Sequence, residues 1–427
     1  MKVLIVSHNP VSTYNGMGKT ISTFFAGFEK SEVCQFYIFP SYPDVDICSS
    51  YYRVTDKEIL KSFFNFKAPG SKVDSVHIGK GATCYENAND EKIYANKKNK
   101  RPFRVLLRDV MWQLSKWYNH RFQQWLNEEK PDCIFLAPGG AKFIYNVALK
   151  ISRKMNIPIV TYIADEYYFI EPERGILGKI QQILLKRKIR EILAVSKSVV
   201  TISEEFEKVY SDKFGCNATT IMTGSNFSVD HIIPTNDYVD GISYFGNIAY
   251  GRYKSLATIG SVLDEINADR GTNYRLDIYS AQKDDAATKV FENVRSIHWH
   301  GFVSGKEFED KFFAAGLLLH TEDFEDRNVD LVKHSVSTKI ADTLSAGIPL
   351  VAYGPENISS MKHLIRNNCA FIATSKETLK STLEIALTDK VARQQVSQHA
   401  MQTASEYHNK ERNSAKLKSI FADIRKI

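Results

Sequence analysis

Charged and hydroxyl side chains gather between His334 and Asp342, in the sequence HSVSTKIAD. Ser337 is a residue type that caps helices, and a Gly and a Pro follow, so the sequence predicts a short helix over Thr338–Ala346. Hydroxyls, backbone amides and Lys339 at the start of such a helix favour an anionic ligand. Asp342, one turn further on, could accept both hydroxyls of a ribose. The alternative is a surface ion pair between Lys339 and Asp342.

A second group of cations lies earlier in the chain, in the sequence FGNIAYGRYKSL from Phe245 to Leu256. It follows an apolar run, Ile242–Asn247, that predicts a strand, and it precedes a helical pattern. Arg252 and Lys254 therefore stand near the start of the predicted helix. The fork of an arginine and the point charge of a lysine suit a diphosphate. The alternative is a solvated basic turn.

Two glycines, Gly16 and Gly18, follow the first apolar run in the sequence NGMGKT. They would let the backbone approach an anion, and a helix starting at about Lys19 would direct its amides at that anion. A nucleoside-triphosphate P-loop needs a glycine where the chain has Thr13, and a dinucleotide fingerprint needs one at Ile21, so neither motif is present. The alternative is a plain turn before a helix.

Two stretches of the N-terminal half combine basic and apolar residues. Residues 97–126 join a basic cluster to an amphipathic pattern that contains Trp112, Trp117 and Trp125, and residues 184–193 have the sequence LLKRKIREIL. Helices of this kind can lie in a membrane interface and attract anionic lipids. In the alternative, tryptophan and leucine face the core of the domain and the basic side chains face water. No nucleic-acid-binding module is present, so we expect no nucleic-acid partner.

The elements that must position these residues repeat in a fixed order: a short apolar strand, a polar turn and an amphipathic helix. Continuous apolar runs are typical of strands that are covered on both faces, as in a parallel sheet. The order starts at Lys2–His8 and starts again at Ile242–Asn247, after a polar stretch, 228–240, that we interpret as a linker. The rhythm therefore predicts two sheets of βαβ units.

Length and composition agree with this organisation. The chain has 427 residues, of which 43% are hydrophobic and 25% charged, which suits two globular domains. Its net charge of +7 permits an anionic partner. Because no apolar run reaches the ~20 residues of a spanning helix, and the N-terminal run is too short for a signal peptide, we expect a cytoplasmic location. We predict an α/β protein of two Rossmann-like, doubly wound domains facing across a cleft, in residues 1–228 and 229–405, followed by a C-terminal helix in 406–427.

The segment STKIADTLSAGIPLVAYGP, Ser337–Pro355, resembles the donor-binding segment of the GT-B glycosyltransferases, particularly the large retaining family with many bacterial polysaccharide enzymes. The GMG loop, TISEEFEKVYSDKFG (201–215), GNIAYGRYK and HGFVS (300–304) follow the order of that family over nearly the whole chain. The resemblance implies the GT-B fold, with the acceptor on the N-terminal domain and the donor mainly on the C-terminal one.

The resemblance also implies a role for each matching residue. Gly16 and Gly18 would border the donor phosphate and the acceptor, Gly301 to Val303 would hold the nucleobase, and Ser337 to Lys339 the phosphates. The implied donor-binding residues are Gly16, Gly18, Gly301, Phe302, Val303, Ser337, Thr338, Lys339 and Asp342, and the implied catalytic residues are Arg252, Lys254, Asp165 and His334.

The sequence departs from the family at two positions. Where the family often has a glutamate that touches the sugar, eight residues before Asp342, this chain has His334. Either His334 takes over that role or a nearby acid does, namely Asp330, Glu325 or Glu322. In the sequence ADEYYF, Ala164 replaces the histidine of a family His-Asp loop, which leaves Asp165 and Glu166 as candidates on the acceptor side. Such acids can otherwise cap a helix.

We therefore expect a hexosyltransferase that moves a sugar from a nucleotide-sugar donor to a glycan or lipid-linked acceptor in bacterial surface polysaccharide biosynthesis. The resemblance implies that the transfer retains the anomeric configuration. No DxD motif appears where a metal would otherwise sit, so neither a metal nor another cofactor is expected, and Arg252, Lys254 and Lys339 would stabilise the leaving diphosphate. The expected location is peripheral on the inner membrane face, through 97–126 and 184–193. One alternative is a sugar-nucleotide epimerase or hydrolase on the same scaffold. The other is a non-enzymatic, basic, membrane-docking protein, in which Arg252, Lys254 and Asp342 need not converge.

Overall fold

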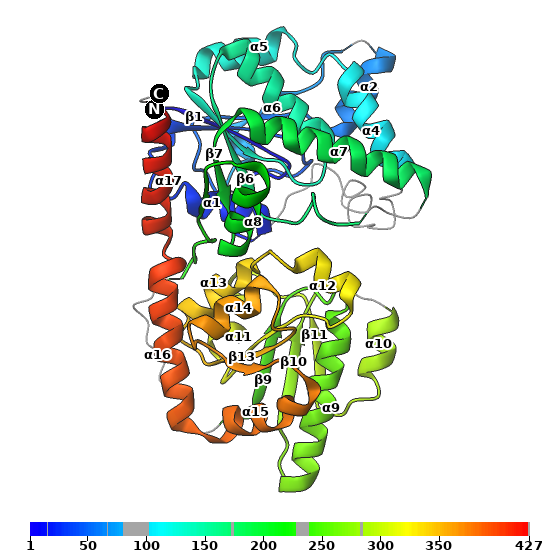
Figure 1. The fold of residues 1–427 in the computed structure, drawn as a ribbon, viewed down its shortest axis with the longest axis vertical. Helices are drawn as coiled ribbons and strands as arrows, with labels where there is room; N and C mark the ends of the chain where they lie inside the picture. Colours follow the sequence, from blue (N-terminus) through cyan, green and yellow to red (C-terminus); the bar gives the residue numbers. More distant parts are fainter. Residues whose placement is uncertain are drawn as a thin grey trace. The chain divides into compact units, whose positions relative to one another are not determined.

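The computed structural model describes residues 1–14, 16–65, 67–79, 102–171, 175–227, 239–281 and 285–425. The chain divides into two compact units, coloured along the sequence in Figure 1: Met1–Thr223 with Lys410–Ile427, and Gly224–Asn409. The sequence placed these boundaries at 228/229 and 405/406, and most of the expected linker, 228–238, lies outside the described residues. Among the described helices, none combines the length and apolar character that crossing a membrane requires.

The first unit is built on an eight-stranded sheet with the order β4-β3-β2-β1-β5-β6-β7-β8, in which only the β3–β4 pair is antiparallel. Its central strands bury every side chain, as the continuous apolar runs predicted. The strands are β1 (Val3–Ser7), β2 (Val33–Tyr37), β3 (Tyr51–Arg53), β4 (Ser71–Lys72), β5 (Cys133–Ala137), β6 (Ile159–Ile163), β7 (Ser196–Thr201) and β8 (Ala218–Thr220).

Helices cover this sheet and include the end of the chain. They are α1 (Gly16–Phe24), α2 (Asp56–Asn65), α4 (Pro102–Leu114), α5 (His120–Glu129), α6 (Lys142–Met155), α7 (Ile176–Val195), α8 (Glu204–Phe214) and α17 (Lys410–Arg425), with short 3₁₀ turns at Lys30–Glu32 and Ser75–His77. The C-terminal helix α17 packs on α1 and on the segment after it: the ring of Phe421 lies 6.3 Å from Phe25 and 6.1 Å from Phe28, and Gly27 N donates to Ser414 Oγ at 2.9 Å.

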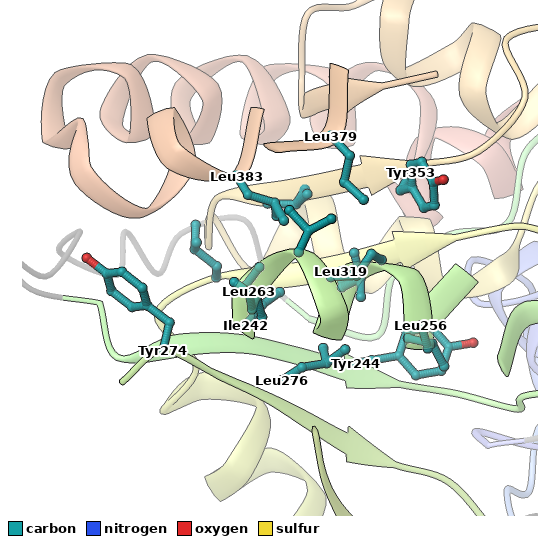
Figure 2. Packing of buried hydrophobic residues seen from close by; sticks show 14 of the residues in the cluster. Ile242, Tyr244, Leu256, Leu263, Tyr274, Leu276, Leu319, Tyr353, Leu379 and Leu383 are labelled. Carbon is teal, nitrogen blue, oxygen red and sulfur yellow. The ribbon is translucent and has the colours of Figure 1, made fainter. Parts of the chain in front are cut away.

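The second unit has a six-stranded, wholly parallel sheet with the order β11-β10-β9-β12-β13-β14. Its strands are β9 (Gly241–Phe245), β10 (Arg275–Tyr279), β11 (Ile297–Gly301), β12 (Leu318–Thr321), β13 (Leu350–Tyr353) and β14 (Phe371–Ala373). Its helices are α9 (Arg252–Arg270), α10 (Asp285–Phe291), α11 (Gly305–Phe313), α12 (Asp326–Val332), α13 (Thr338–Ser345), α14 (Ser359–Arg366), α15 (Lys376–Thr388) and α16 (Lys390–Tyr407). Figure 2 shows how α9 and α15 close the core, with Leu263 and Leu383 packed over Ile242, Leu276 and Leu319.

Each sheet has one point where the strand order reverses. In the first unit this point is at β1, whose neighbours are β2 on one side and β5 on the other, and in the second it is at β9, between β10 and β12. In doubly wound folds, the loops at the carboxyl ends of the strands part at such a point and leave a crevice that takes ligands. The residues that follow β1, β9 and β12 are therefore the strongest candidates for contact with a ligand.

Helix α1 begins earlier than the sequence indicated, at Gly16 rather than at about Lys19. Helix α9 begins at Arg252, so Arg252 and Lys254 lie in its first turn, as expected. Gly251, immediately before α9, has a φ of +74°, which favours glycine, and the chain can therefore turn sharply into the helix. Helix α13 agrees with its predicted range to within one residue.

The amphipathic stretch at 102–126 does not expose its tryptophans. Trp112, Trp117 and Trp125 are only 1%, 5% and 2% exposed and belong to the core of the first unit. The apolar residues Leu185, Ile189 and Leu193 of the basic stretch 184–193 are buried as well. For these tryptophan and aliphatic side chains, the alternative in which they face the core is therefore correct. Residues 97–101 of the same stretch lie outside the described residues.

Candidate functional site

A two-bond ion pair lies at the reversal point of the second sheet. Arg252 opens α9, after β9, and Glu322 directly follows β12. Arg252 Nε donates to Glu322 Oε2 at 2.8 Å and Nη2 donates to Oε1 at 2.7 Å. The side chains are 13% and 4% exposed, so the pair is largely shielded from water. A paired fork of this kind fixes the guanidinium in one orientation.

Asn247 and Tyr244 complete the surroundings of the guanidinium. Arg252 Nη1 donates to Asn247 Oδ1 at 2.8 Å, and Tyr244 Oη donates to the Asn247 carbonyl at 2.6 Å. Burial alone would lower the pKa of Arg252, but the Glu322 carboxylate raises it above its ordinary value, so the guanidinium stays charged. Burial raises the pKa of Tyr244, which remains a neutral donor. Neither Asn247 nor Tyr244 was among the site residues predicted from the sequence.

Lys339 reaches the same end of β9 from the first turn of α13. Its ammonium lies 6.0 Å from the centre of the Tyr244 ring. A Cβ on Gly246 would collide with Lys339 Nζ and would come within 2.9 Å of Tyr244 Oη, so only glycine leaves room for this approach. The same charges affect His320, in β12. Burial lowers the pKa of His320 to about 4, and the nearby Arg252 and Lys339 contribute to this decrease. The structure thus brings Arg252, Glu322 and Lys339 together.

Lys254, two residues after Arg252, points to a different acid. Its ammonium contacts the Glu325 carboxylate, and this hydrogen bond raises the pKa of Lys254. Both side chains are well exposed, at 42% and 58%, so this is a surface ion pair that contributes little to stability. Glu322 and Glu325, two of the acids considered as replacements at His334, therefore both hold a cation.

The remaining residues of the 334–342 segment lie at or near α13. Ser337 is the N-cap of α13, although its hydroxyl makes no capping hydrogen bond to the helix. Asp342 Oδ1 accepts hydrogen bonds from Ser225 Oγ at 3.1 Å and from Asn226 N at 3.2 Å. His334 lies between α12 and α13 and is partly exposed. Asp342 thus helps to hold the start of the second unit in place.

The predicted nucleobase residues follow β11. Gly301 has a φ of +82°, and Phe302 beside it is 68% exposed. Three rings at the carboxyl ends of neighbouring strands stack in series: Phe245 on Tyr279 at 4.6 Å, and Tyr279 on His300 at 4.8 Å. This series was not predicted, because the pairing of β9, β10 and β11 creates it.

In the first unit, the two loop glycines differ. Gly16 is exposed, and an added Cβ would meet no described atom within 4 Å. Gly18 is buried, and its Cβ would lie 2.8 Å from Ser12 Cβ and against the Pro10 carbonyl. Packing alone therefore accounts for Gly18, whereas it does not require glycine at position 16.

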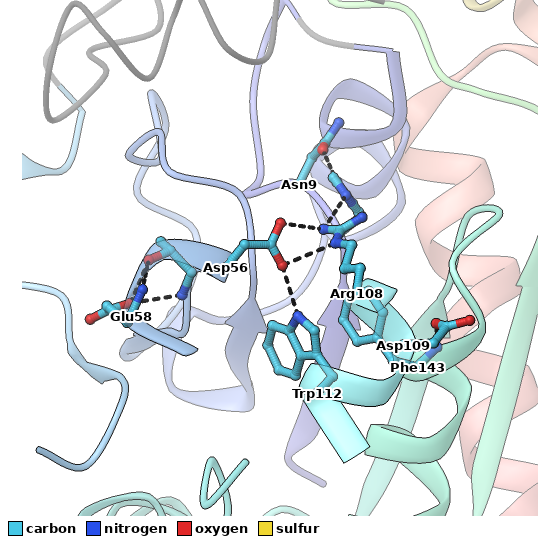
Figure 3. A network of polar contacts seen from close by, with 9 residues as sticks. Asn9, Asp56, Glu58, Arg108, Asp109, Trp112 and Phe143 are labelled. Carbon is cyan, nitrogen blue, oxygen red and sulfur yellow. Dashed lines mark hydrogen bonds and ion pairs between the residues drawn. The ribbon is translucent and has the colours of Figure 1, made fainter. Parts of the chain in front are cut away.

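The residues after β1 belong to a polar network that sequence reasoning missed (Figure 3). Arg108, in α4, bonds Asp56 through Nε at 3.0 Å and Nη2 at 2.9 Å, and Trp112 Nε1 donates to the same carboxylate at 2.7 Å. Arg108 Nη2 lies 3.4 Å from His8 Nε2, and His8 Nδ1 lies 2.8 Å from Asn9 Oδ1. Burial opposes ionisation of Asp56, but Arg108 lowers its pKa. The only sequence signal was the position of His8 and Asn9 at the end of the first apolar run.

Asp165 and Glu166, after β6, have different surroundings. Asp165 is exposed, and its Oδ2 accepts from Tyr167 Oη at 3.0 Å. Glu166 is buried, and its Oε1 accepts from the amides of Tyr168 at 3.2 Å and Phe169 at 2.9 Å. Glu166 therefore holds the turn after β6, much as a capping acid would, and Asp165 is the one that faces solvent.

Solved structures with the GT-B fold resemble the chain along its whole length. HepE of Anabaena, solved with UDP and glucose, matches with a TM-score of 0.62 and 11% identity over 99% of this chain and 100% of that one. WaaG, a glycosyltransferase involved in lipopolysaccharide biosynthesis, gives 0.55 and 13% over 97% and 98%. Sucrose-phosphate synthase of Thermosynechococcus elongatus gives 0.60 and 12% over 99% and 98%. No family model and no curated protein matches the sequence. The prediction of a GT-B fold with two Rossmann-like sheets is confirmed.

Proposed function

We propose that this GT-B protein is a glycosyltransferase that binds a nucleotide-sugar donor at the reversal point of its second sheet. The observation that carries the proposal is the Arg252–Glu322 pair with Lys339 beside it, where β9 and β12 diverge. Loops at such a point take nucleotides in doubly wound folds. HepE has been solved with UDP and with UDP-glucose, and TarM with UDP, which supports a nucleotide-sugar as the ligand class.

The residues suggest how the leaving group would be stabilised. Departure of a nucleoside diphosphate concentrates negative charge on its phosphate oxygens. Glu322 and Asn247 orient the Arg252 guanidinium before the donor arrives, and Lys339 adds a charge from the first turn of α13. The amide end of that helix favours an anion as well. Preorganised cations and dipoles of this kind stabilise developing charge in a transition state.

Several finer features belong to the proposal. The transferred group would be a hexose, moved with retention and without a metal or another cofactor, since side chains would supply the positive charge. The acceptor would be a glycan or a lipid-linked glycan of bacterial surface polysaccharide biosynthesis, reached from the cytoplasmic side. The involvement of the structural neighbour WaaG in lipopolysaccharide biosynthesis supports this acceptor class. Ser337, Thr338 and Asp342 would bind phosphate and ribose, and Gly301 to Val303 the base. Lys254 would help to neutralise the diphosphate, and Asp165 and His334 would act near the reacting sugar.

The test is thermal stabilisation of the purified protein by UDP, GDP, CMP and their sugars. Lys339→Met should abolish stabilisation by the nucleotide that works. Lys380→Met is a matched control, because Lys380 is a partly exposed lysine of the same unit that pairs with Asp269 at 2.6 Å. Arg252→Ala is a poor probe, since it would leave the buried Glu322 carboxylate unpaired and weaken the fold itself.

The outcomes separate the proposal from its rivals. Stabilisation by one nucleotide, lost in Lys339→Met and kept in Lys380→Met, supports a donor site in the second unit. The stabilising donor is then incubated without acceptor and followed by NMR. Rapid conversion of the sugar under these conditions would instead indicate an epimerase or a hydrolase. If no nucleotide stabilises the protein at millimolar concentration, the proposal is wrong.

A further inference from the structure

Three helices of the first unit expose large apolar side chains beside one another. Helix α4 packs against both α2 and α7, and the three helices lie together in Figure 1. Phe64 is 79% exposed, Leu114 68%, Ile176 77% and Ile183 66%. The full set, here called the apolar face, is Leu60, Phe63, Phe64, Phe103, Leu107, Val110, Leu114, Ile176, Leu177, Ile180 and Ile183. Isolated exposed apolar residues are ordinary, but a set this large on neighbouring helices marks an interaction surface.

The spacing of these residues shows that they form stripes. In α4 the exposed positions 103, 107, 110 and 114 recur every three or four residues, so they follow one side of the helix. The opposite side of α4 carries Asp109 and Trp112, which are buried in the unit. In α7, positions 176, 180 and 183 are exposed, whereas Gln182 and Leu185 are buried. Helices α4 and α7 therefore each have one side for the core and a second apolar side that the described residues of the unit leave exposed.

The exposed charges on the three helices themselves are of one sign. Every charged side chain of α2, α4 and α7 that is exposed is basic: Lys57, Lys61, Arg104, Lys179, Arg187 and Arg190. The acids of the same helices are buried or partly buried and engaged, since Asp56 bonds Arg108, Glu58 bonds Thr55, Glu191 bonds Lys188, and Asp109 bonds the Phe143 amide. An anionic partner is therefore complementary to this surface.

We propose that the apolar face docks on an anionic lipid bilayer, with the three helices lying in the interface rather than crossing it. Apolar stripes bordered by Lys and Arg are the arrangement of helices that insert into the headgroup region of such membranes. The surface differs from the one that the sequence suggested. The tryptophans of α4 and α5 and of the loop between them are buried, and aliphatic side chains and phenylalanines of α2, α4 and α7 are exposed instead. If the proposed function holds, docking presents the enzyme to a lipid-linked acceptor, but the docking itself does not depend on that function.

The experiment is co-sedimentation of the full-length protein with vesicles of phosphatidylcholine alone or with one quarter phosphatidylglycerol. The test variant is Leu114→Gln/Ile183→Gln. The control variant is Ile385→Gln/Val391→Gln, which removes apolar side chains of similar exposure, 48% and 62%, from helices of the second unit. A charge variant, Lys179→Gln/Arg187→Gln, tests the basic border.

We expect the wild type to bind the anionic vesicles at least ten-fold more tightly than the neutral ones. The test variant should lose ten-fold or more of this affinity, the charge variant should lose several-fold and respond less to salt, and the control should stay within two-fold. Two results would overturn the proposal: no binding of the wild type to anionic vesicles, or equal binding of the test and control variants. A dimer that the test variant abolishes, seen by light scattering, would also overturn it in favour of a contact between copies. Nucleotide stabilisation measured on the same variants should not change, so this proposal and the proposed function can fail separately.

Discussion

The guanidinium of Arg252 and the carboxylate of Glu322 form a two-bond fork although 70 residues separate them in the sequence. Glu322 is 4% exposed in its side chain, so its carboxylate has little access to water and Arg252 is its ion-pair partner. The relationship predicts which substitutions the second unit tolerates, because a buried carboxylate without a cation is far more costly than a buried pair replaced as a whole.

Arg252→Ala should therefore destabilise the protein by about 3–5 kcal/mol. Arg252→Lys should cost less, since it keeps the charge and loses the fork. The double variant Arg252→Met/Glu322→Leu should recover most of the stability, because no unpaired charge is left. Urea unfolding followed by circular dichroism measures the order of the three midpoints. If Arg252→Ala unfolds at the wild-type midpoint, Glu322 is hydrated and the pair is not a structural element.

The two loop glycines provide a second prediction. Gly18→Ala should cost about 1–3 kcal/mol, because its Cβ would press on Ser12 and on the Pro10 carbonyl. Gly16→Ala, at the start of α1 and with no described atom within 4 Å of its Cβ, should be neutral or stabilise by up to about 1 kcal/mol. The measurements are the unfolding midpoint and the turnover of donor. A drop in turnover for Gly16→Ala without a loss of stability would support its place beside the donor phosphate, and unchanged turnover would remove it from the site.

Much of the fold follows from the sequence because its strands are buried on both faces. The run Cys133–Ala137 is wholly apolar and wholly buried, and it could be assigned to a parallel sheet without any tertiary information. Helix α13 was predictable as well, since its N-cap serine and the glycine after it mark both ends locally. These signals lie within a few residues of the elements they define.

The contacts of the site were not predictable, since they depend on strand order. Lys339 meets Gly246 only because β9 lies beside β12, and Arg108 meets Asp56 across more than fifty residues of chain. Periodicity also left the buried side of α4 undecided. It shows that Trp112 and Leu114 lie on different sides of the helix, but which of the two sides is buried depends on α2, α6 and α7, the helices that pack against α4.

Asp342 leads to a prediction that separates binding from structure. Its Oδ1 holds Ser225 Oγ and the Asn226 amide, so it could serve that segment alone or a ribose as well. Ser225→Ala removes one of these bonds and keeps the carboxylate, and should leave donor affinity within about two-fold. Asp342→Asn should weaken donor binding about ten-fold if the carboxylate accepts ribose hydroxyls, an effect of about 1.4 kcal/mol. Titration calorimetry with the stabilising nucleotide measures both. Equal effects of the two variants on affinity would assign Asp342 to the Ser225–Asn226 segment only.

His320 makes the stability of the second unit depend on pH. It is buried in β12, where its Nε2 lies 3.2 Å from Ser360 Oγ, and burial lowers its pKa from 6.5 to about 4. Between these values the unfolded chain binds a proton that the native state excludes, so stability rises with pH through this window and falls on acidification. The shift corresponds to about 3 kcal/mol over the whole window and about 2 kcal/mol between pH 6.5 and 5.

His320→Gln should remove that part of the slope, so its midpoint of urea unfolding should change less between pH 6.5 and 5 than that of the wild type. His363, whose pKa burial and His408 lower to about 3, should leave a remaining slope of similar sign in both proteins. The matched control is His399→Gln, an exposed histidine of α16, which should keep the wild-type dependence. Above pH 5 most carboxylates stay ionised, so their titration adds little to the measured change in stability. If His320→Gln and the wild type lose stability in parallel, His320 already carries its proton in the native state. The assignment of a neutral imidazole to buried His320 would then be wrong.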